Sequence, residues 1–217
     1  TNQNILYVGH GVDDVARLSG RSAEEVVAVL NTAKTKLFDA RCRRRRPHLD
    51  DKVLAGWNGL MIAAFARAAR VVPASDSTEL SLLDTANSAA EFVRARLWDT
   101  ERCVLYRRFR DGHADIDGFA EDYASVIWGL LELFQAGGDP VWLDWAKQLQ
   151  QTQNQLFWDD EDGGWFNTTG TDPTVLLRLK EDYDGAEPSA GSVSVWNLLT
   201  LAHLSGPDAV SYTHLRA

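Results

Sequence analysis

Carboxylate-bearing patches stand directly before apolar segments at three places in this chain, residues 47–52, 117–123 and 184–189. A pair of carboxyl groups, one of them with a raised pKa, can act as the acid and the base or nucleophile of glycoside cleavage. We therefore select four acids as candidate catalytic residues: Glu121, Asp122, Asp184 and Glu187.

Aromatic, amide and basic side chains accompany these acids. A sugar site needs flat apolar surfaces for C–H faces and polar groups for hydroxyls. The pairs Trp57-Asn58 and Trp196-Asn197 supply both types at adjacent positions, although core packing of each Trp and a helix-end hydrogen bond of each Asn explain them equally well. The candidate substrate-binding residues are Asp50, Lys52, Trp57, Asn58, Tyr123, Lys180, Trp196 and Asn197.

Each acid also has a structural explanation, because the free N–H groups at a helix start favour negative charge and a capping carboxylate. For a single acid, capping is the stronger explanation, and recurrence beside aromatic and basic residues is what favours a site. Sugar epimerisation commonly uses a histidine pair, but of the five histidines only His48 is near a patch. The spacing of Asp182 and Asp184 fits no metal motif, so we expect no metal and no cofactor.

The elements that would position these residues are helices. Apolar spacing predicts helices at residues 23–39, 53–71, 79–98, 120–135, 142–157 and 192–204, and a short extended segment at 104–109. Helices that are apolar all round alternate with amphipathic ones, which indicates an inner and an outer layer. Leu97-Trp98-Asp99 recurs as Phe157-Trp158-Asp159, which indicates an internal repeat.

This pattern predicts an all-α fold of stacked helical hairpins, an α/α toroid of which about three hairpins are present. In such a ring the inner helices run parallel, so their N-terminal ends meet on one face. The three acidic patches stand at those ends. The prediction is therefore one shared pocket.

Composition excludes several classes of protein. The chain has 217 residues, a net charge of -9 and a pI near 5.0, which argues against nucleic-acid and anionic-membrane partners. No apolar run is long enough to span a bilayer. Cys42 and Cys103 form no CxxC motif, and we expect both to be reduced, a disulfide between them being the less favoured alternative.

Both ends of the chain carry organisational signals. The N-terminus has no initiator Met and no targeting pattern, so we expect an internal start and a soluble fragment, without a predicted compartment. Five arginines within residues 41–46 read as a solvated linker, with a localisation or phosphate-binding patch as the alternative. We expect a partial toroid domain at residues 1–205, followed by a tail at 206–217 that looks non-native.

The motifs also carry a family resemblance. Residues 46–61, 118–124 and 177–193, with Pro47-His48-Leu49-Asp50, Gly118-Phe119-Ala120-Glu121-Asp122-Tyr123 and Asp184-Gly185-Ala186-Glu187-Pro188-Ser189, resemble the spermatogenesis-associated protein 20 family. The resemblance covers roughly residues 3–205. Asp51 stands where relatives often have a smaller residue, so Asp50 and Lys52 are the preferred candidates in that patch.

The resemblance implies a fold and two functions. It implies a thioredoxin-like domain outside this chain, followed by a six-hairpin glycosidase-like toroid that is similar to N-acylglucosamine 2-epimerases and of which this chain is a part. Carbohydrate binding, or hydrolysis or epimerisation of a carbohydrate, is the first function that we expect, in a protein linked to spermatogenesis. The alternative is a non-catalytic toroid that presents the redox domain to client proteins. A carbohydrate ligand and such clients are the partners implied.

Overall fold

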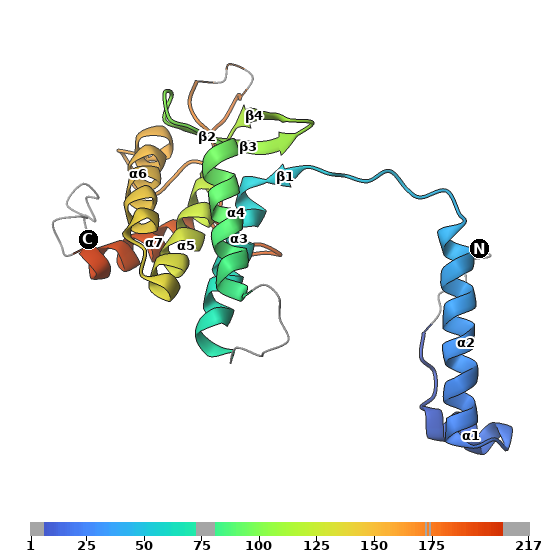
Figure 1. Ribbon diagram of the computed structural model, residues 1–217. Helices are drawn as coiled ribbons and strands as arrows, with labels where there is room; N and C mark the ends of the chain where they lie inside the picture. The colour runs from blue at the N-terminus through green and yellow to red at the C-terminus, as the bar shows by residue number, and fades with distance from the viewer. Residues whose placement is uncertain (1–6, 73–80, 172, 174, 206–217) are drawn as a thin grey trace. The chain divides into compact units, whose positions relative to one another are not determined.

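The computed structural model describes residues 7–72, 81–171, 173 and 175–205. The chain divides between Asp50 and Asp51 into two compact units (Figure 1). The predicted tail at 206–217 and the turn expected at 73–78 lie outside the described residues. The two units are not placed relative to each other. One domain across residues 1–205 therefore stays a prediction.

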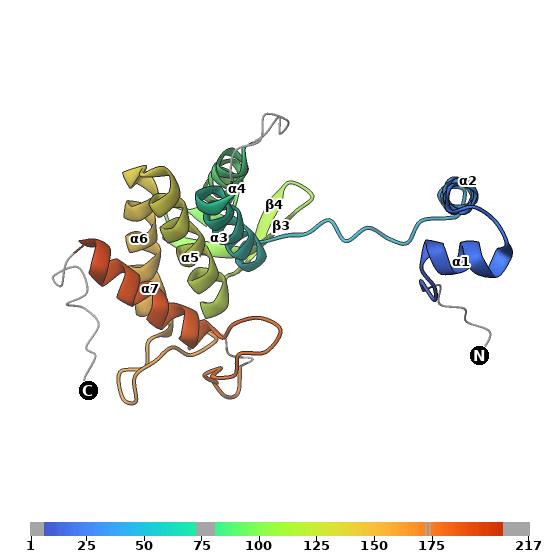
Figure 2. The ribbon, with the colours of Figure 1, turned by 90° about the horizontal axis from the view of Figure 1, so that it is seen from below.

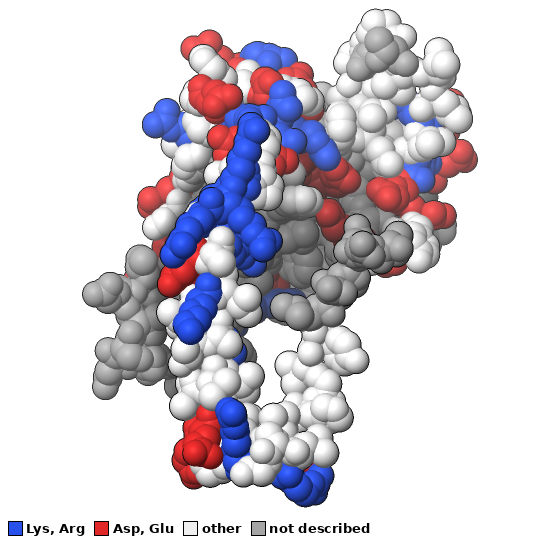
Figure 3. All heavy atoms as spheres, turned by 90° about the vertical axis from the view of Figure 1, so that its right-hand side faces the viewer, with Lys and Arg blue, Asp and Glu red and all other residues white. Residues whose placement is uncertain are grey.

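The N-terminal unit is a pair of helices, α1 (Val12–Ser19) and α2 (Ala23–Cys42). The Ser22 side chain accepts from the Glu25 N–H, and the Glu25 carboxylate accepts from the Ser22 N–H, so a capping box fixes the start of α2. Within the described residues only Val26 of these helices is buried. Beyond the end of α2 the run of arginines is exposed, and Figure 3 shows Lys and Arg side chains gathered there.

The second unit carries the remaining elements, and they match the expected helices and strand closely. They are β1 (Val53–Leu54), α3 (Ala55–Val71), α4 (Leu82–Arg96), β2 (Trp98–Asp99), β3 (Val104–Arg110), β4 (His113–Asp117), α5 (Ala120–Gly137), α6 (Pro140–Phe157) and α7 (Ala190–Ser205). None of the helices in the described parts of the chain is long and apolar enough to cross a membrane. Cys42 and Cys103 are free and exposed.

Helices α3, α5 and α7 form an inner layer, and α4 and α6 lie on its outer side (Figure 2). The middle helix, α5, buries residues on every side, whereas α4 and α6 each bury one face. Contacts along α3 and α5 advance in the same direction, from Gly56 against Asp122 to Gly59 against Ser125. The two helices are therefore parallel, as the toroid prediction requires.

Glycines let α3 and α5 approach almost backbone to backbone. A Cβ on Gly59 would lie 2.4 Å from the carbonyl carbon of Ser125, and one on Gly129 would lie 2.6 Å from the carbonyl oxygen of Gly59. No side chain fits in either place. This contact sets the separation of the two helices and, with it, the distance between their N-terminal ends.

Helix α7 joins the same layer through buried polar contacts. The Asn197 amide donates to the Ala124 carbonyl at 2.8 Å, and the Gln153 amide donates to both the Ala120 carbonyl and the Ser194 hydroxyl. Ser194 therefore lies near the start of α5, and Asn197 lies one turn further along both helices. The start of α7 thus stands beside the start of α5.

A small antiparallel sheet at the helix ends completes the unit. Strand β3 pairs with β1, β2 and β4, with Val53 opposite Phe109 and Trp98 opposite Leu105. The predicted segment at 104–109 is thus confirmed as a strand. The sequence repeat is structural as well, because Asp99 and Asp159 each accept backbone N–H groups of the turn that follows an outer helix.

Candidate functional site

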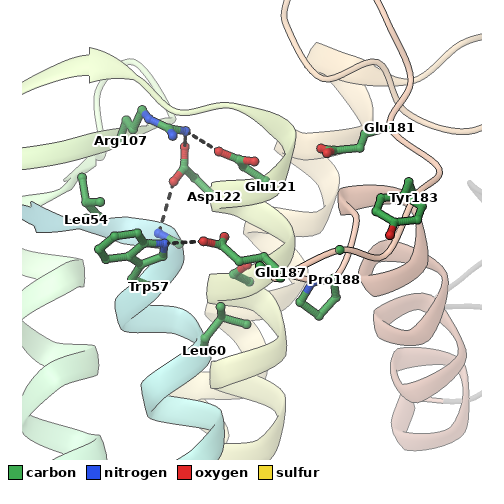
Figure 4. Close-up of a pocket in the computed structure, with 14 residues that line it drawn as sticks. Leu54, Trp57, Leu60, Arg107, Glu121, Asp122, Glu181, Tyr183, Glu187 and Pro188 are labelled. Atoms are coloured by element: carbon green, nitrogen blue, oxygen red, sulfur yellow. Dashed lines mark hydrogen bonds and ion pairs between the residues drawn. The ribbon is translucent and has the colours of Figure 1, made fainter. Parts of the chain in front are cut away.

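A cleft of about 380 Å³ opens where α3 and α5 begin and where the loop before α7 passes them (Figure 4). This is the size of a small-molecule site. Its lining residues come from every one of these segments: Leu54, Gly56, Trp57, Leu60, Arg107, Glu121, Asp122, Ser125, Glu181, Tyr183, Gly185, Ala186, Glu187 and Pro188. The cleft brings together four of the predicted residues, Trp57, Glu121, Asp122 and Glu187.

Asp122 ties three elements together behind the cleft. Its carboxylate accepts from the N–H of Gly56 at the start of α3, from the N–H of Phe119 before α5, and from Nη1 of Arg107 in β3, at 3.2, 3.0 and 2.9 Å. Burial raises the pKa of Asp122, while the N–H groups and the guanidinium oppose that rise. All three donors belong to the protein itself, so the role of Asp122 is to hold α3, α5 and β3 in place around the cleft.

Glu121, one residue earlier, faces the cleft. Nη1 of Arg107 also donates to its Oε1 at 2.6 Å, and the guanidinium lies over the Phe119 ring at 4.7 Å. The Glu121 side chain keeps 41% of its surface exposed. Glu121 is thus an oriented carboxylate that remains accessible to a ligand.

Trp57 forms the opposite wall. The residue is 58% exposed, yet its Nε1 donates to Oε1 of Glu187 at 2.8 Å, so the loop before α7 holds the edge of the indole. An aromatic ring that is exposed to solvent and held at one edge is suited to stack on a ligand. Figure 4 shows Trp57, Glu121 and Glu187 around the same opening.

Other predicted residues serve helix ends. Asp184 accepts from the Ser189 N–H at 2.9 Å and from the Ser192 hydroxyl at 3.3 Å, contacts that lower the pKa of Asp184 and fix the start of α7. The Asn58 amide donates to the carbonyl of Leu54 at 2.8 Å. Both residues thus make hydrogen bonds at helix ends, as the structural alternative in the sequence analysis expected, and neither lines the cleft.

The remaining candidates lie away from the cleft. Tyr123 and Asn197 are enclosed in the core, where the Tyr123 hydroxyl accepts from the Leu105 N–H. Trp196 is exposed on α7 but does not line the opening, and Lys180 pairs with Asp159 and donates to the Gly163 carbonyl.

The first acidic patch spans the boundary between the two units. Asp50 ends the N-terminal unit, and Lys52 follows Asp51, where the second unit begins; both residues are exposed. Lys52 is not among the lining residues.

Sequence reasoning missed three of the polar lining residues, Arg107, Glu181 and Tyr183. Arg107 lies in β3 two residues after the buried Leu105, and residues two apart in a strand share a face. This spacing was the only sequence feature that indicated its position. Glu181 and Tyr183 lie directly before the third patch, between the predicted residues Lys180 and Asp184. Among the described residues, no group of three His, Cys, Asp or Glu could hold a metal ion.

Comparison with known sequences identifies relatives, although no family model matches the chain. It is 43% identical over 215 residues to spermatogenesis-associated protein 20 of Mus musculus and 41% identical over 213 residues to that of Homo sapiens. Each match covers 94% of this chain and 26% of the relative. The chain therefore spans about a quarter of the length of these relatives. An uncharacterised Caenorhabditis elegans protein is 34% identical over 206 residues.

Solved structures share the fold at low sequence identity. The cellobiose 2-epimerase of Bacillus thermoamylovorans has a TM-score of 0.57 at 18% identity, covering 74% of this chain and 42% of that one. A family 105 glycoside hydrolase of C. acetobutylicum has a TM-score of 0.57 at 11% identity, covering 93% and 57%. The GH76 α-mannanase of Bacteroides thetaiotaomicron gives 0.55, covering 77% and 41%. This likeness confirms the predicted partial α/α toroid.

Proposed function

From the premise that this chain is a relative of the spermatogenesis-associated protein 20 family, a resemblance that the sequence matches confirm, we propose that its cleft binds a carbohydrate. The matched structures with the same fold are named as sugar epimerases and glycoside hydrolases. The proposal for this chain rests on its own residues, because a shared fold does not establish a shared reaction.

The exposed and immobilised indole of Trp57 carries the proposal. Burying an indole is favourable, and Trp57 is 58% exposed. Covering its ring with an apolar ligand face therefore stabilises the complex. The hydrogen bond to Glu187 fixes one edge of the ring in advance. The C–H face of a sugar ring matches this surface, and the carboxylates around it can accept from hydroxyls.

Glu121 and Glu187 are the carboxylates that would act on a bound sugar. One would donate a proton to a leaving oxygen or take one from a reacting carbon, and the other would complete the acid and base pair. Asp122 would not touch the sugar. It would hold Arg107, and Arg107 would hold Glu121.

A titration tests the binding step. Neutral sugars, among them glucose, mannose, N-acetylglucosamine and cellobiose, are added to the full-length protein while tryptophan fluorescence is followed. A saturable response to at least one of them in the millimolar range is expected. Product analysis on the bound sugar, with Glu121→Gln beside the wild type, then tests chemistry. If none of the sugars changed the tryptophan fluorescence, the proposal would be rejected.

A non-catalytic scaffold is the second candidate, and one observation favours it. Several of the candidate residues already have partners within the fold, because Asp184 caps α7, Lys180 pairs with Asp159, and Asp122 joins α3 to α5. A toroid built in this way would present a thioredoxin-like domain to client proteins. Thiol-trapping of clients by the full-length protein, but not by its redox domain alone, is the expected result.

A further inference from the structure

The charge of the cleft is unbalanced. The described residues of its lining include four acidic side chains, Glu121, Asp122, Glu181 and Glu187, and one basic side chain, Arg107. In Figure 4 Glu121 and Glu181 reach into the same space from opposite sides, from α5 and from the loop before α7. A ligand in this space therefore meets carboxylates on both sides.

The only guanidinium of the lining is already engaged. Nη1 of Arg107 donates to Glu121 and Asp122, and its flat face lies over the Phe119 ring. Two carboxylates therefore already offset the charge of this guanidinium, and a carboxylate on a ligand gains little net attraction from it. If the ligand displaced Asp122, that buried acid would lose its charged partner, which costs free energy.

Among the described residues, neither glutamate of the loop has a cationic partner. Glu187 accepts from the uncharged indole N–H of Trp57, and no ion pair joins Glu181 or Glu187 to another side chain in that part of the chain. A cation placed between these carboxylates gains Coulomb energy, and an anion loses it. The net charge of -9 gives the surrounding field the same sign.

We propose that this cleft selects its sugars by charge, so that a sugar carrying an ammonium group binds more tightly than the neutral sugar of the same ring, and one carrying a carboxylate binds more weakly. The inference rests on the proposed sugar site and adds the class of sugar: amino sugars with a free amine are favoured, and uronic acids are disfavoured. Glu181 is the specificity-determining residue, because its carboxylate faces the opening and has no ion-pair partner among the residues that the structure describes.

A matched series of probes tests this ordering. Glucosamine and glucuronate each differ from glucose at one substituent: an ammonium replaces the 2-hydroxyl in the first, and a carboxylate replaces the C6 hydroxymethyl group in the second. Mannosamine, mannose and mannuronate form the same series on the other ring configuration. Each is titrated into the full-length protein, at a pH where the amine is protonated, by tryptophan fluorescence and calorimetry. At low salt the amino sugar should bind about threefold more tightly than the neutral sugar, and the uronate about threefold more weakly, as partly exposed charge pairs allow.

Salt and a variant identify the cause. In about 1 M salt, where the screening length is about 3 Å, the three affinities should converge. Glu181→Gln should lower the affinity for the amino sugar more than the affinity for the neutral sugar, so that the preference for the amine shrinks. Glu91→Gln, on the exposed side of α4, is the matched control and should change nothing.

The two proposals fail in different ways. Equal affinities within a series, or a preference for the uronate, would overturn the charge selection and leave the sugar site standing. A preference that survives both high salt and Glu181→Gln would overturn it too. Absence of binding by all the probes, together with the neutral panel, would overturn both.

Discussion

The indole Nε1 of Trp57 lies 2.8 Å from Oε1 of Glu187, a contact that joins the first turn of α3 to the loop before α7 across 130 residues of sequence. Both side chains are exposed. An exposed hydrogen bond adds little to stability, but this one fixes an aromatic ring at the mouth of a cleft. Its value is in pre-organising a surface for a ligand.

Replacing that ring gives the first prediction. Trp57→Ala should weaken binding of any sugar that the wild type binds by about tenfold, because the stacking surface is lost, and should leave the free energy of unfolding within about 1 kcal/mol. Trp196→Ala is the control, since Trp196 is similarly exposed but does not line the cleft. Calorimetric titration of both variants would contradict the site if they lost affinity equally.

The second prediction concerns Asp122 and stability. Asp122→Ala removes the acceptor of two backbone N–H groups and of Arg107, and leaves buried donors without partners. The free energy of unfolding should fall by about 3 kcal/mol. Asp184→Ala, which removes an exposed cap, should cost clearly less. Urea unfolding followed by circular dichroism measures both, and equal losses would contradict the central position given to Asp122.

Much of the fold could be predicted because local signals and tertiary packing agree. The capping box at Ser22, the break at Gly138 and the alternation of buried with amphipathic helices all follow from sequence. The meeting of the inner-helix ends follows from parallel packing. The sequence analysis did not predict strand β4 or the first helix, α1. Helix α1 is amphipathic but only 8 residues long, and β4 is a strand of 5 mostly exposed residues.

The site could be predicted only in part, because it depends on which way each helix turns. Tyr123 belongs to the second patch and Asn197 follows the third, but their positions on α5 and α7 direct them into the core. There Tyr123 accepts from the Leu105 N–H and Asn197 donates to the Ala124 carbonyl. The role of Arg107 could not be predicted, because it depends on β3 lying beside the start of α5. Tertiary packing brings these two elements together, and no spacing of residues in the sequence indicates it.

The third prediction tests the close approach of the inner helices. Gly59→Ala places a methyl group 2.4 Å from the Ser125 backbone, which cannot move aside without moving α5. We expect a loss of about 2–3 kcal/mol in the free energy of unfolding and a weaker sugar response. Gly137→Ala, at the end of α5, meets only Leu83 at 3.7 Å and should be neutral or slightly stabilising. Thermal unfolding of the two variants compares them, and a neutral Gly59→Ala would refute the contact.

The fourth prediction uses the ion pair of Asp159 with Lys180. The hydrogen bond from the Lys180 ammonium is the main reason that the pKa of Asp159 lies below its ordinary value of 3.8. A lowered folded-state pKa stabilises the fold above the unfolded-state pKa, and this contribution disappears as the pH falls through the folded-state value. Asp159→Asn should therefore be less stable than the wild type at pH 7, and the difference should shrink below about pH 4. Urea unfolding measured across pH tests this, and a difference that stays constant with pH for Asp159→Asn would contradict the assignment.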